Sequence, residues 1–531
     1  MDDKDRTRDG DADSVKKMPL GAPDEIRNVD DDKASASFVF DKTRRTLKNR
    51  HIQLIGIGGT VGTALFVQIG SSLTKGGPAE MVTWMPISSP FVRYADRFVD
   101  PALGFCAGVN FFVFETALIP FEIVAFNVVL QFWTDKIPTA SVICFLLVAY
   151  CLLNVFAVRF YGESEFWLAL GKAILAVGVI IFTFVTMVGG NPLHDAYGFR
   201  YWNPAKVQGA PFAEYIQTGS LGQFMGFLAC LIQASFTIAG PDYVSMAAGE
   251  AHDPRRNMPQ AFSSVFYRLT AFFILGSLCV GTVVPYNDPD LLHAISNAHP
   301  GAGASPYVIA MQHLKIPVLP HIMNALILSA VFSAGNSYVF CASRTLFGLA
   351  LEGKAPRFLT RCTGSGVPIY CVALTLGISL ISLLQLSNNA AVVIQWFVNL
   401  VTASQLMNYA IISFTYIRFH KALKAQGISR DSLPHKSFWQ PFCGQVSIYA
   451  HTYYAFVATF TMAFVGGYTV FLPGRWDVPS FLFSYTMIAV VPLLFIYWKV
   501  RHSTEWQPLE TMTFFEKERM LVDQYEEELH S

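Results

Sequence analysis

Apolar residues in this chain gather in stretches of roughly 20, the length that crosses about 30 Å of hydrocarbon as an α-helix. Between these stretches the sequence turns polar and basic. The pattern predicts about eleven membrane-spanning helices. We place them at 52–72, 102–133, 138–158, 165–189, 219–243, 262–285, 320–348, 368–388, 393–417, 447–472 and 479–498.

Composition supports a membrane protein and excludes several other classes. Of 531 residues, 53% are hydrophobic and only 14% are charged, against roughly a quarter charged in soluble domains. A formal net charge of zero gives no sign of nucleic-acid binding. The nine cysteines form no C-x-x-C pair, and no nucleophile–base pair stands out. We therefore expect no metal, no cofactor and no enzymatic activity.

Basic residues between the spans predict the orientation, since cytoplasmic loops are enriched in Lys and Arg. The pattern predicts a disordered cytoplasmic tail over 1–50, a transmembrane domain over 51–500 and a cytoplasmic C-terminal tail over 501–531. No cleavable signal is visible in the first 40 polar residues, so the first span would act as the signal. The basic residues that place both termini and three loops inside are Lys42, Arg44, Arg45, Lys48, Arg50, Arg255, Arg256, Arg344, Lys354, Arg357, Arg361, Arg418, Lys421, Lys424, Arg430, Lys436, Lys499 and Arg501.

Successive spans must cross the membrane in alternating directions. With these loops inside, residues 73–101 must also cross the membrane, and their composition does not allow it. The segment contains four prolines, at 78, 86, 90 and 101, and six charged residues. A spanning helix needs about 20 predominantly apolar residues. One membrane span is therefore missing at this point.

Two spans are interrupted by small residues or proline. The first runs through Gly56, Gly58 and Gly59 to Gly62, and the span at 219–243 contains Thr237-Ile238-Ala239-Gly240-Pro241-Asp242. Paired broken helices indicate the substrate site of an inverted-repeat transporter, because unwound backbone exposes amides to an anion and carbonyls to a cation. The alternative is a small-residue packing face between helices. A dinucleotide-binding loop is disfavoured, since no strand precedes these glycines.

Ionisable residues at membrane depth are costly and mark functional sites. They are Glu115, Glu122, Lys172 and Asp242. Glu115 could simply face water in a vestibule, and Glu122 could make a structural hydrogen bond. Lys172 could snorkel to the cytoplasmic interface, or it could stand as a switchable ammonium between helices.

Eight short motifs are spread over about residues 45–505. They are Gly58-Gly59-Thr60-Val61-Gly62-Thr63-Ala64, Gly76-Gly77-Pro78-Ala79, Pro120-Phe121-Glu122-Ile123-Val124-Ala125, Gly162-Glu163-Ser164-Glu165-Phe166-Trp167, Ala239-Gly240-Pro241-Asp242, Pro254-Arg255-Arg256-Asn257-Met258-Pro259, Ser343-Arg344-Thr345-Leu346 and Tyr416-Ile417-Arg418-Phe419. As a set they resemble those of the fungal amino-acid permeases of the amino acid–polyamine–organocation superfamily. The resemblance implies an all-α, twelve-helix, leucine-transporter-type inverted-repeat bundle, proton-coupled amino-acid uptake and a plasma-membrane location. It also implies that the family's second helix, which lies between the elements ending at Ala79 and starting at Glu80, is deleted here.

The resemblance and the physics of helix ends together imply a site. The backbone of Gly62, Thr63, Ala64 and Leu65 would receive the substrate carboxylate. Carbonyls of Phe236, Thr237 and Ile238 would receive the amine, with Phe236 as a gate or else a core- or lipid-facing aromatic. Glu122 would lie near the amine or the side-chain pocket, and Lys172 would couple a proton. The polar residues Thr402, Ser404, Gln405 and Asn408 would line the pathway or form interhelical hydrogen bonds.

Two departures from the family pattern concern the substrate: Ala64 replaces a glycine, and Asp242 replaces a glutamate. They indicate a subgroup with unusual substrates, such as carnitine or a polyamine in place of an amino acid. Two other functions stay open. One is a permease-like nutrient sensor that binds without transporting, and the other is a transport-incompetent product that lacks one helix.

We predict that restoring the missing helix rescues the chain. The chain as printed should stay inside the cell without uptake, because either its later spans insert upside down or its first helix fails to span. A version with a relative's second helix between Ala79 and Glu80 should reach the surface and take up amino acids. Surface biotinylation and radiolabelled uptake measure both. Robust uptake by the shorter chain would contradict the missing span.

Overall fold

The computed structural model describes residues 90–156, 158–207, 212–237, 253–292, 305–363, 366–428 and 447–512. All regular secondary structure within these ranges is helical, and all of it belongs to a single unit that runs from Val39 to Ser531. The helices are α4 (Pro90–Phe98), α5 (Pro101–Leu130), α6 (Thr139–Phe156), α7 (Val158–Met187), α8 (Gly219–Thr237), α10 (Pro254–Val283), α12 (Pro306–His313), α13 (Leu319–Leu351), α14 (Ile369–Ser379), α15 (Ala390–Ala425), α16 (Ser447–Val465) and α17 (Val478–His502). Short 3₁₀ turns lie at Arg200–Trp202, Arg357–Thr360, Leu380–Leu386 and Tyr468–Phe471.

Within the described residues, eight helical stretches are long and apolar enough to cross a membrane. Two shorter apolar helices, Ala271–Val283 and Thr452–Val465, belong to spans predicted from the sequence. The predicted first span, 52–72, lies outside the described residues, so the total number of spans stays a prediction. Residues 73–101 were predicted to be unable to cross the membrane. The described part of this segment contains α4, which has nine residues. Such a helix is about 13 Å long and cannot cross a bilayer.

α5 is the central helix and packs against α4, α13, α15 and α17. In its most apolar 18-residue window 83% of residues are buried. Small residues on α5 allow this close packing. A Cβ at Gly104 would stand 2.7 Å from the Cβ of Asp96, and one at Gly108 would collide with the side chain of Leu349 on α13. Substituting Gly104 therefore requires α5 to move away from the α4 backbone, whereas at Gly108 the side chain of Leu349 must shift.

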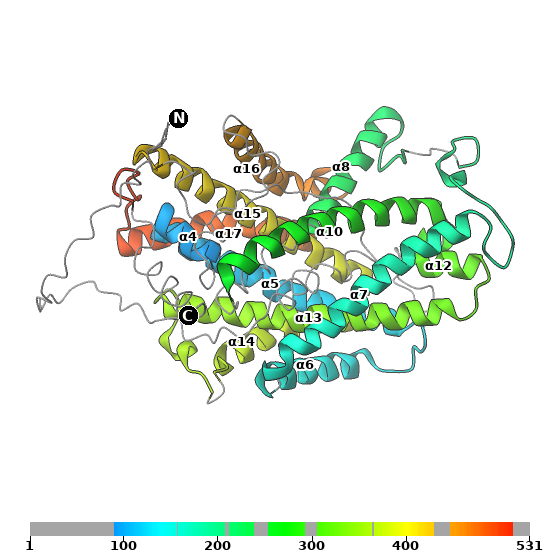
Figure 1. Cartoon of the computed structure of the whole chain (residues 1–531), viewed down its shortest axis with the longest axis horizontal. Helices are drawn as coiled ribbons and strands as arrows, with labels where there is room; N and C mark the ends of the chain where they lie inside the picture. The colour runs from blue at the N-terminus through cyan, green and yellow to red at the C-terminus, as the bar shows by residue number, and fades with distance from the viewer. Residues whose placement is uncertain are drawn as a thin grey trace, which may run out of the picture. The chain divides into compact units, whose positions relative to one another are not determined.

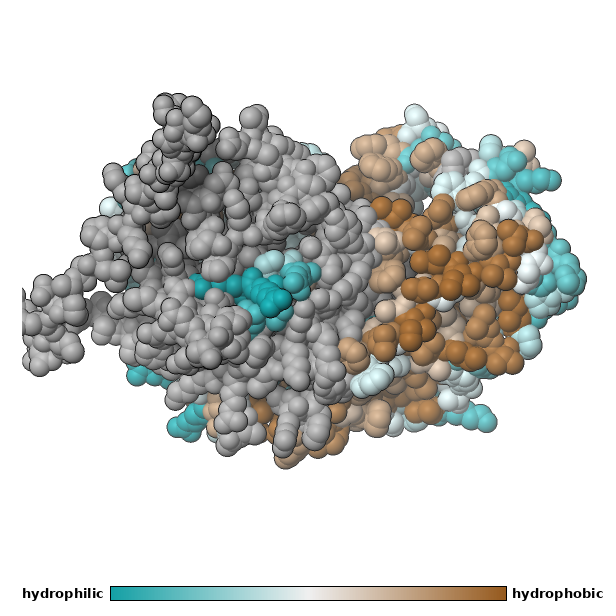
Figure 2. Space-filling model, in the orientation of Figure 1, coloured by the Kyte–Doolittle hydropathy of each residue, from teal (hydrophilic) through white to brown (hydrophobic). Residues whose placement is uncertain are grey.

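The outer helices present apolar side chains to their surroundings. In the apolar 18-residue parts of α6, α8 and α17, only 28%, 28% and 22% of the residues are buried within the protein. Figure 2 shows a broad hydrophobic surface on the right of the view, with hydrophilic residues along its outer edge. Large exposed side chains include Phe145, Leu152 and Phe156 on α6. An extended apolar surface bounded by polar residues fits contact with lipid.

The end of α13 is tied to α4 by a buried lysine. Lys354 Nζ lies 2.7 Å from Asp96 Oδ1 and 3.0 Å from Glu352 Oε2, and its side chain is only 6% exposed. Burial acts to lower the pKa of Lys354, but the two carboxylates outweigh it and raise the pKa above its ordinary value. A raised pKa means that this stabilisation is complete below the unfolded-state pKa, about 10.4, and is lost only as pH rises through the folded-state pKa.

We predict that Lys354→Met destabilises the protein at neutral pH by about 2 kcal/mol, between the values for buried and exposed ion pairs. The change removes the ammonium group from two partly buried carboxylates, of which Glu352 still faces Arg93 Nε at 3.6 Å. Chemical denaturation in detergent measures the change. Lys424→Met, which removes an exposed lysine from α15, is the control and should have little effect. Equal losses from both variants would show that the contacts of Lys354 contribute nothing specific.

Candidate functional site

Glu122 lies in the middle of α5, in the turn that follows an internal proline. Pro120 has no N–H, so the carbonyl four residues earlier, at Thr116, loses its helical partner. Glu122 is 1% exposed and is surrounded by the hydrophobic cluster that contains Phe121, Ile123 and Tyr150. A carboxyl group at this depth is costly to bury, which marks the position for a function.

A ring contact joins α8 to the residue that precedes this carboxyl group. Phe236, in the last described turn of α8, packs edge-on against Phe121, with ring centroids 5.2 Å apart and planes at 66°. Phe236 is 4% exposed, so the interpretation that it faces lipid is wrong. Phe236 and Phe121 belong to the same hydrophobic cluster. The structure therefore brings Phe236 into the region of the core that contains Glu122.

Tyr150 is a further polar group at this place that the sequence reasoning missed. It is fully buried on α6 and lies close enough to Glu122 for the two to interact electrostatically. Its hydroxyl packs directly against Gly335 of α13 and has no hydrogen-bond partner among the described residues. One turn further along, Asn154 Nδ2 donates to Asn336 Oδ1 of α13 at 2.9 Å. The four-residue spacing of Tyr150 and Asn154 in an apolar span was the available signal.

Lys172 is buried on α7, with 2% of the residue exposed. Its side chain is enclosed by protein, so the interpretation that it snorkels to the interface is wrong. The adjacent turns contribute Ala169, Leu175 and Ala176 to a hydrophobic cluster shared with α10, α12 and α13. Glu115 is likewise 0% exposed, so it does not face water in a vestibule.

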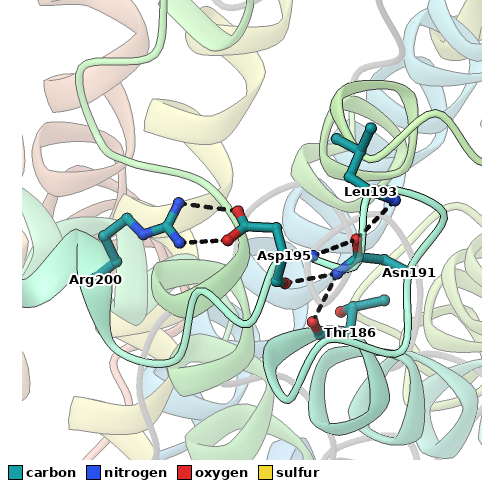
Figure 3. A network of polar contacts seen from close by, with 5 residues as sticks. All are labelled: Thr186, Asn191, Leu193, Asp195 and Arg200. Atoms are coloured by element: carbon teal, nitrogen blue, oxygen red, sulfur yellow. Dashed lines mark hydrogen bonds and ion pairs between the residues drawn. The ribbon is translucent and has the colours of Figure 1, made fainter.

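The end of α7 is fixed by a polar network drawn in Figure 3. Asn191 Nδ2 donates to the carbonyls of Thr186, at 3.0 Å, and Asp195, at 2.7 Å. Its Oδ1 accepts from the backbone N–H groups of Leu193 and Asp195. Arg200 makes two hydrogen bonds to the Asp195 carboxylate and lowers the pKa of that group. The network holds in place the helix that carries Lys172.

Several predicted site residues fall outside the described residues: Gly62, Thr63, Ala64, Leu65 and Ile238. Thr237 ends α8, but its side chain is not described. Their roles, and those of Glu122, Phe236 and Lys172, stay predictions.

Four polar residues of α15 were predicted to line the pathway or to form interhelical hydrogen bonds: Thr402, Ser404, Gln405 and Asn408. All are buried, each at most 3% exposed. Asn110 Nδ2 of α5 donates to the carbonyl of Ser404 at 2.8 Å, and Thr402 Oγ1 donates to the carbonyl of Val398 at 2.6 Å. An interhelical hydrogen bond is therefore present at Ser404. This hydrogen bond contributes to the packing of α5 against α15.

Among the described residues, one group has the composition of a metal site: Asp288, Asp290 and His313. His313 Nε2 lies 2.9 Å from Asp290 Oδ2, and Nδ1 lies 3.6 Å from Asp288 Oδ2. Each ring nitrogen faces a different carboxylate, so pairing with the imidazole already explains the arrangement. It offers no reason to assign an ion.

Comparison with known proteins identifies the family. The amino acid permease family model matches residues 51–508. The chain is 47% identical to the general amino acid permease AGP2 of Saccharomyces cerevisiae, over 87% of this chain and 80% of that protein. It is 39% identical to a proline-specific permease of Emericella nidulans, over 87% of this chain and 86% of that protein.

A solved structure shows the same fold. A manganese transporter of Eremococcus coleocola matches with a TM-score of 0.52 at 12% identity, over 87% of this chain and 98% of that one. The predicted fold class, an all-α membrane bundle of the leucine-transporter type, is confirmed. With its eight described apolar stretches, the chain is a multi-pass membrane protein, and it belongs to the amino acid permease family.

Proposed function

We propose that this protein is a secondary active permease that uses a proton gradient to take up an amino acid across the plasma membrane. Membership of the permease family supports amino-acid transport in general. The observation that carries the finer proposal is the buried carboxyl group of Glu122, which follows Phe121, the residue whose ring packs on Phe236 of α8. A buried anion next to the end of a helix suits a substrate that carries an ammonium group.

The two charges of the substrate would be recognised separately. Backbone N–H groups at Gly62–Leu65 would receive the carboxylate, because the start of a half-helix favours an anion. At the other predicted break, the carbonyls of Phe236, Thr237 and Ile238 would lie at the end of a half-helix, which favours a cation. Glu122 would add a full negative charge near the amine. Phe121 and Phe236 would shield the bound substrate from water.

Lys172 would couple the proton. It is an enclosed amine on a helix that packs against α13 and α10, so a change in its charge would alter packing between helices. A lysine that gains and loses a proton during the cycle could take the place of a coupling cation. Arginine could not replace it, because the guanidinium does not deprotonate in proteins.

The substrate proposal is an amino acid, with carnitine or a polyamine as related alternatives. The relatives above are named for general and for proline-specific transport, so relatedness alone leaves the side-chain preference open. Ala64 and Asp242 are the positions that would alter it. Asp242 is one methylene shorter than glutamate and would leave more room beside the break.

A second candidate, a protein that binds substrate without transporting it, is supported by the composition of residues 73–101. Their four prolines and six charged residues do not suit a membrane span. We therefore propose that transport activity requires the family's second helix. Transport tests should compare this chain with the helix-restored version, which carries a relative's second helix between Ala79 and Glu80.

We predict that Lys172→Met abolishes accumulation of radiolabelled amino acid against a gradient in permease-deficient cells. The helix-restored parent should accumulate substrate, and a protonophore should stop it. Lys172→Arg should also fail to accumulate, because it keeps the charge but cannot release a proton. Both variants should still exchange substrate across the membrane.

Two outcomes would contradict the coupling role. Accumulation by Lys172→Arg at the parental level would show that a fixed charge suffices. Uptake that follows external sodium and ignores pH would show that protons are not the coupling ion.

A further inference from the structure

The ten residues after α17, Ser503–Met512, turn back along the helix bundle. Ser503 ends α17 in the left-handed conformation, with φ at +49°. This conformation reverses the chain direction, as helix-ending residues commonly do. We call residues 503–512 the strap.

The strap binds the corner between α4 and α5. Thr504 Oγ1 donates to Asp100 Oδ1 at 2.7 Å, and the Gln507 N–H donates to the carbonyl of Val99 at 2.9 Å. Lys499 Nζ donates to Asp100 Oδ2 and to the Thr504 carbonyl. Asp100 is fully buried and also caps α5 by accepting from the Ala102 N–H. One carboxylate thus joins the start of α5, the end of α17 and the strap.

The strap also binds the end of α15. Arg418 donates to the carbonyls of Gln507 and Phe98, and therefore links the strap to the same corner. Gln426 Nε2 donates to the carbonyls of Leu509, at 3.0 Å, and Met512, at 2.8 Å. The ring of Trp506 contacts aromatic rings of α15 and α17. These contacts come from residues up to 404 positions apart in the sequence.

Side chains along the strap divide into two sets. Thr504, Gln507 and Leu509 are partly buried, and Met512 is only 4% exposed. Glu505, Pro508, Glu510 and Thr511 are exposed. A segment with one buried face and one exposed face is docked along its whole length rather than at one point.

We infer that the strap is a releasable clasp that holds the adjacent ends of α5, α15 and α17 together. Any conformation that separates α5 from α15 and α17 at this end must break the contacts of Asp100 and Arg418. The Thr504 hydroxyl is the release point, because a negative charge at that position faces the buried Asp100 carboxylate at hydrogen-bond distance. Loss of this bond removes the hydroxyl of the strap from Asp100, which still accepts from Lys499 and still caps the helix that carries Glu122.

Thiol labelling of Met512→Cys tests the clasp in the full chain. Cys144, Cys230, Cys362 and Cys443 are first replaced by serine, and a membrane-impermeant maleimide is added to opened membranes. In the parent, Met512→Cys should react at least about tenfold more slowly than Thr511→Cys, because one position is covered and the other is exposed. Adding Thr504→Glu should raise Met512→Cys labelling about tenfold, since a buried charged hydrogen bond is lost.

Matched variants separate release of the strap from general unfolding. Thr504→Val keeps the shape and removes the hydroxyl, so it should raise labelling by a smaller factor. Thr504→Ser keeps the hydroxyl, and Ser503→Glu adds the same charge at an exposed neighbour. Neither should change labelling. Cys371, which is buried on α14 away from the strap, should stay unreactive in every variant.

Two results would overturn the inference. Equal labelling of Met512→Cys and Thr511→Cys in the parent would show that the strap is not docked. Labelling unchanged by both Thr504→Glu and Thr504→Val, with Cys371 protected, would show that Thr504 does not hold it.

Discussion

α5 is enclosed by other helices along most of its length, and the remaining architecture depends on that enclosure. Its polar residues at 100, 110, 115 and 122 are all buried. Charged and polar groups inside a membrane protein are expensive, so each needs neighbours that stabilise it. The strap and Lys499 bind Asp100, and the α15 carbonyl of Ser404 binds Asn110. The helices around α5 are therefore positioned by its polar residues as well as by its apolar ones.

The candidate site follows from this arrangement. Pro120 interrupts the hydrogen bonding of α5 at its most enclosed region, and Glu122 comes directly after it. Phe121 and Phe236 connect this region to the end of α8, and Tyr150 reaches it from α6 while packing on Gly335 of α13. Residues of α5, α6, α8 and α13 thus form one hydrophobic cluster around the turn that contains Glu122. Lys172 lies on α7, whose end is held by the Asn191 network.

The lengths of the apolar stretches, and the residues that interrupt them, predicted much of the fold. The span predicted at 102–133 is α5, Pro101–Leu130. The break predicted from Thr237 onward lies outside the described residues, except for Thr237 itself. Between 368 and 388, α14 changes to a 3₁₀ turn at Leu380, which hydrophobicity does not reveal. The short α12 lies between the predicted spans at 262–285 and 320–348 and was not predicted, since eight residues give no membrane-length signal.

Contacts between distant residues were beyond sequence reasoning. Nothing in the local pattern pairs Thr504 with Asp100 or Tyr150 with Gly335, because neither pair shares a periodicity. Burial also decided what the sequence left open: Lys172 and Glu115 are enclosed, whereas their side-chain lengths and positions allowed either outcome. The family pattern located Glu122, but only packing showed that the ring of Phe236 lies against its neighbour Phe121.

Equilibrium binding of a radiolabelled amino acid to the purified, helix-restored protein tests the central claim most directly. The parent should bind substrate saturably, and Glu122→Gln should weaken binding at least about tenfold, as expected for loss of a buried charged contact. Glu505→Gln, which removes an exposed carboxylate from the strap, should leave affinity unchanged. Parental affinity in Glu122→Gln, with the variant folded, would contradict a substrate site at α5 and α8.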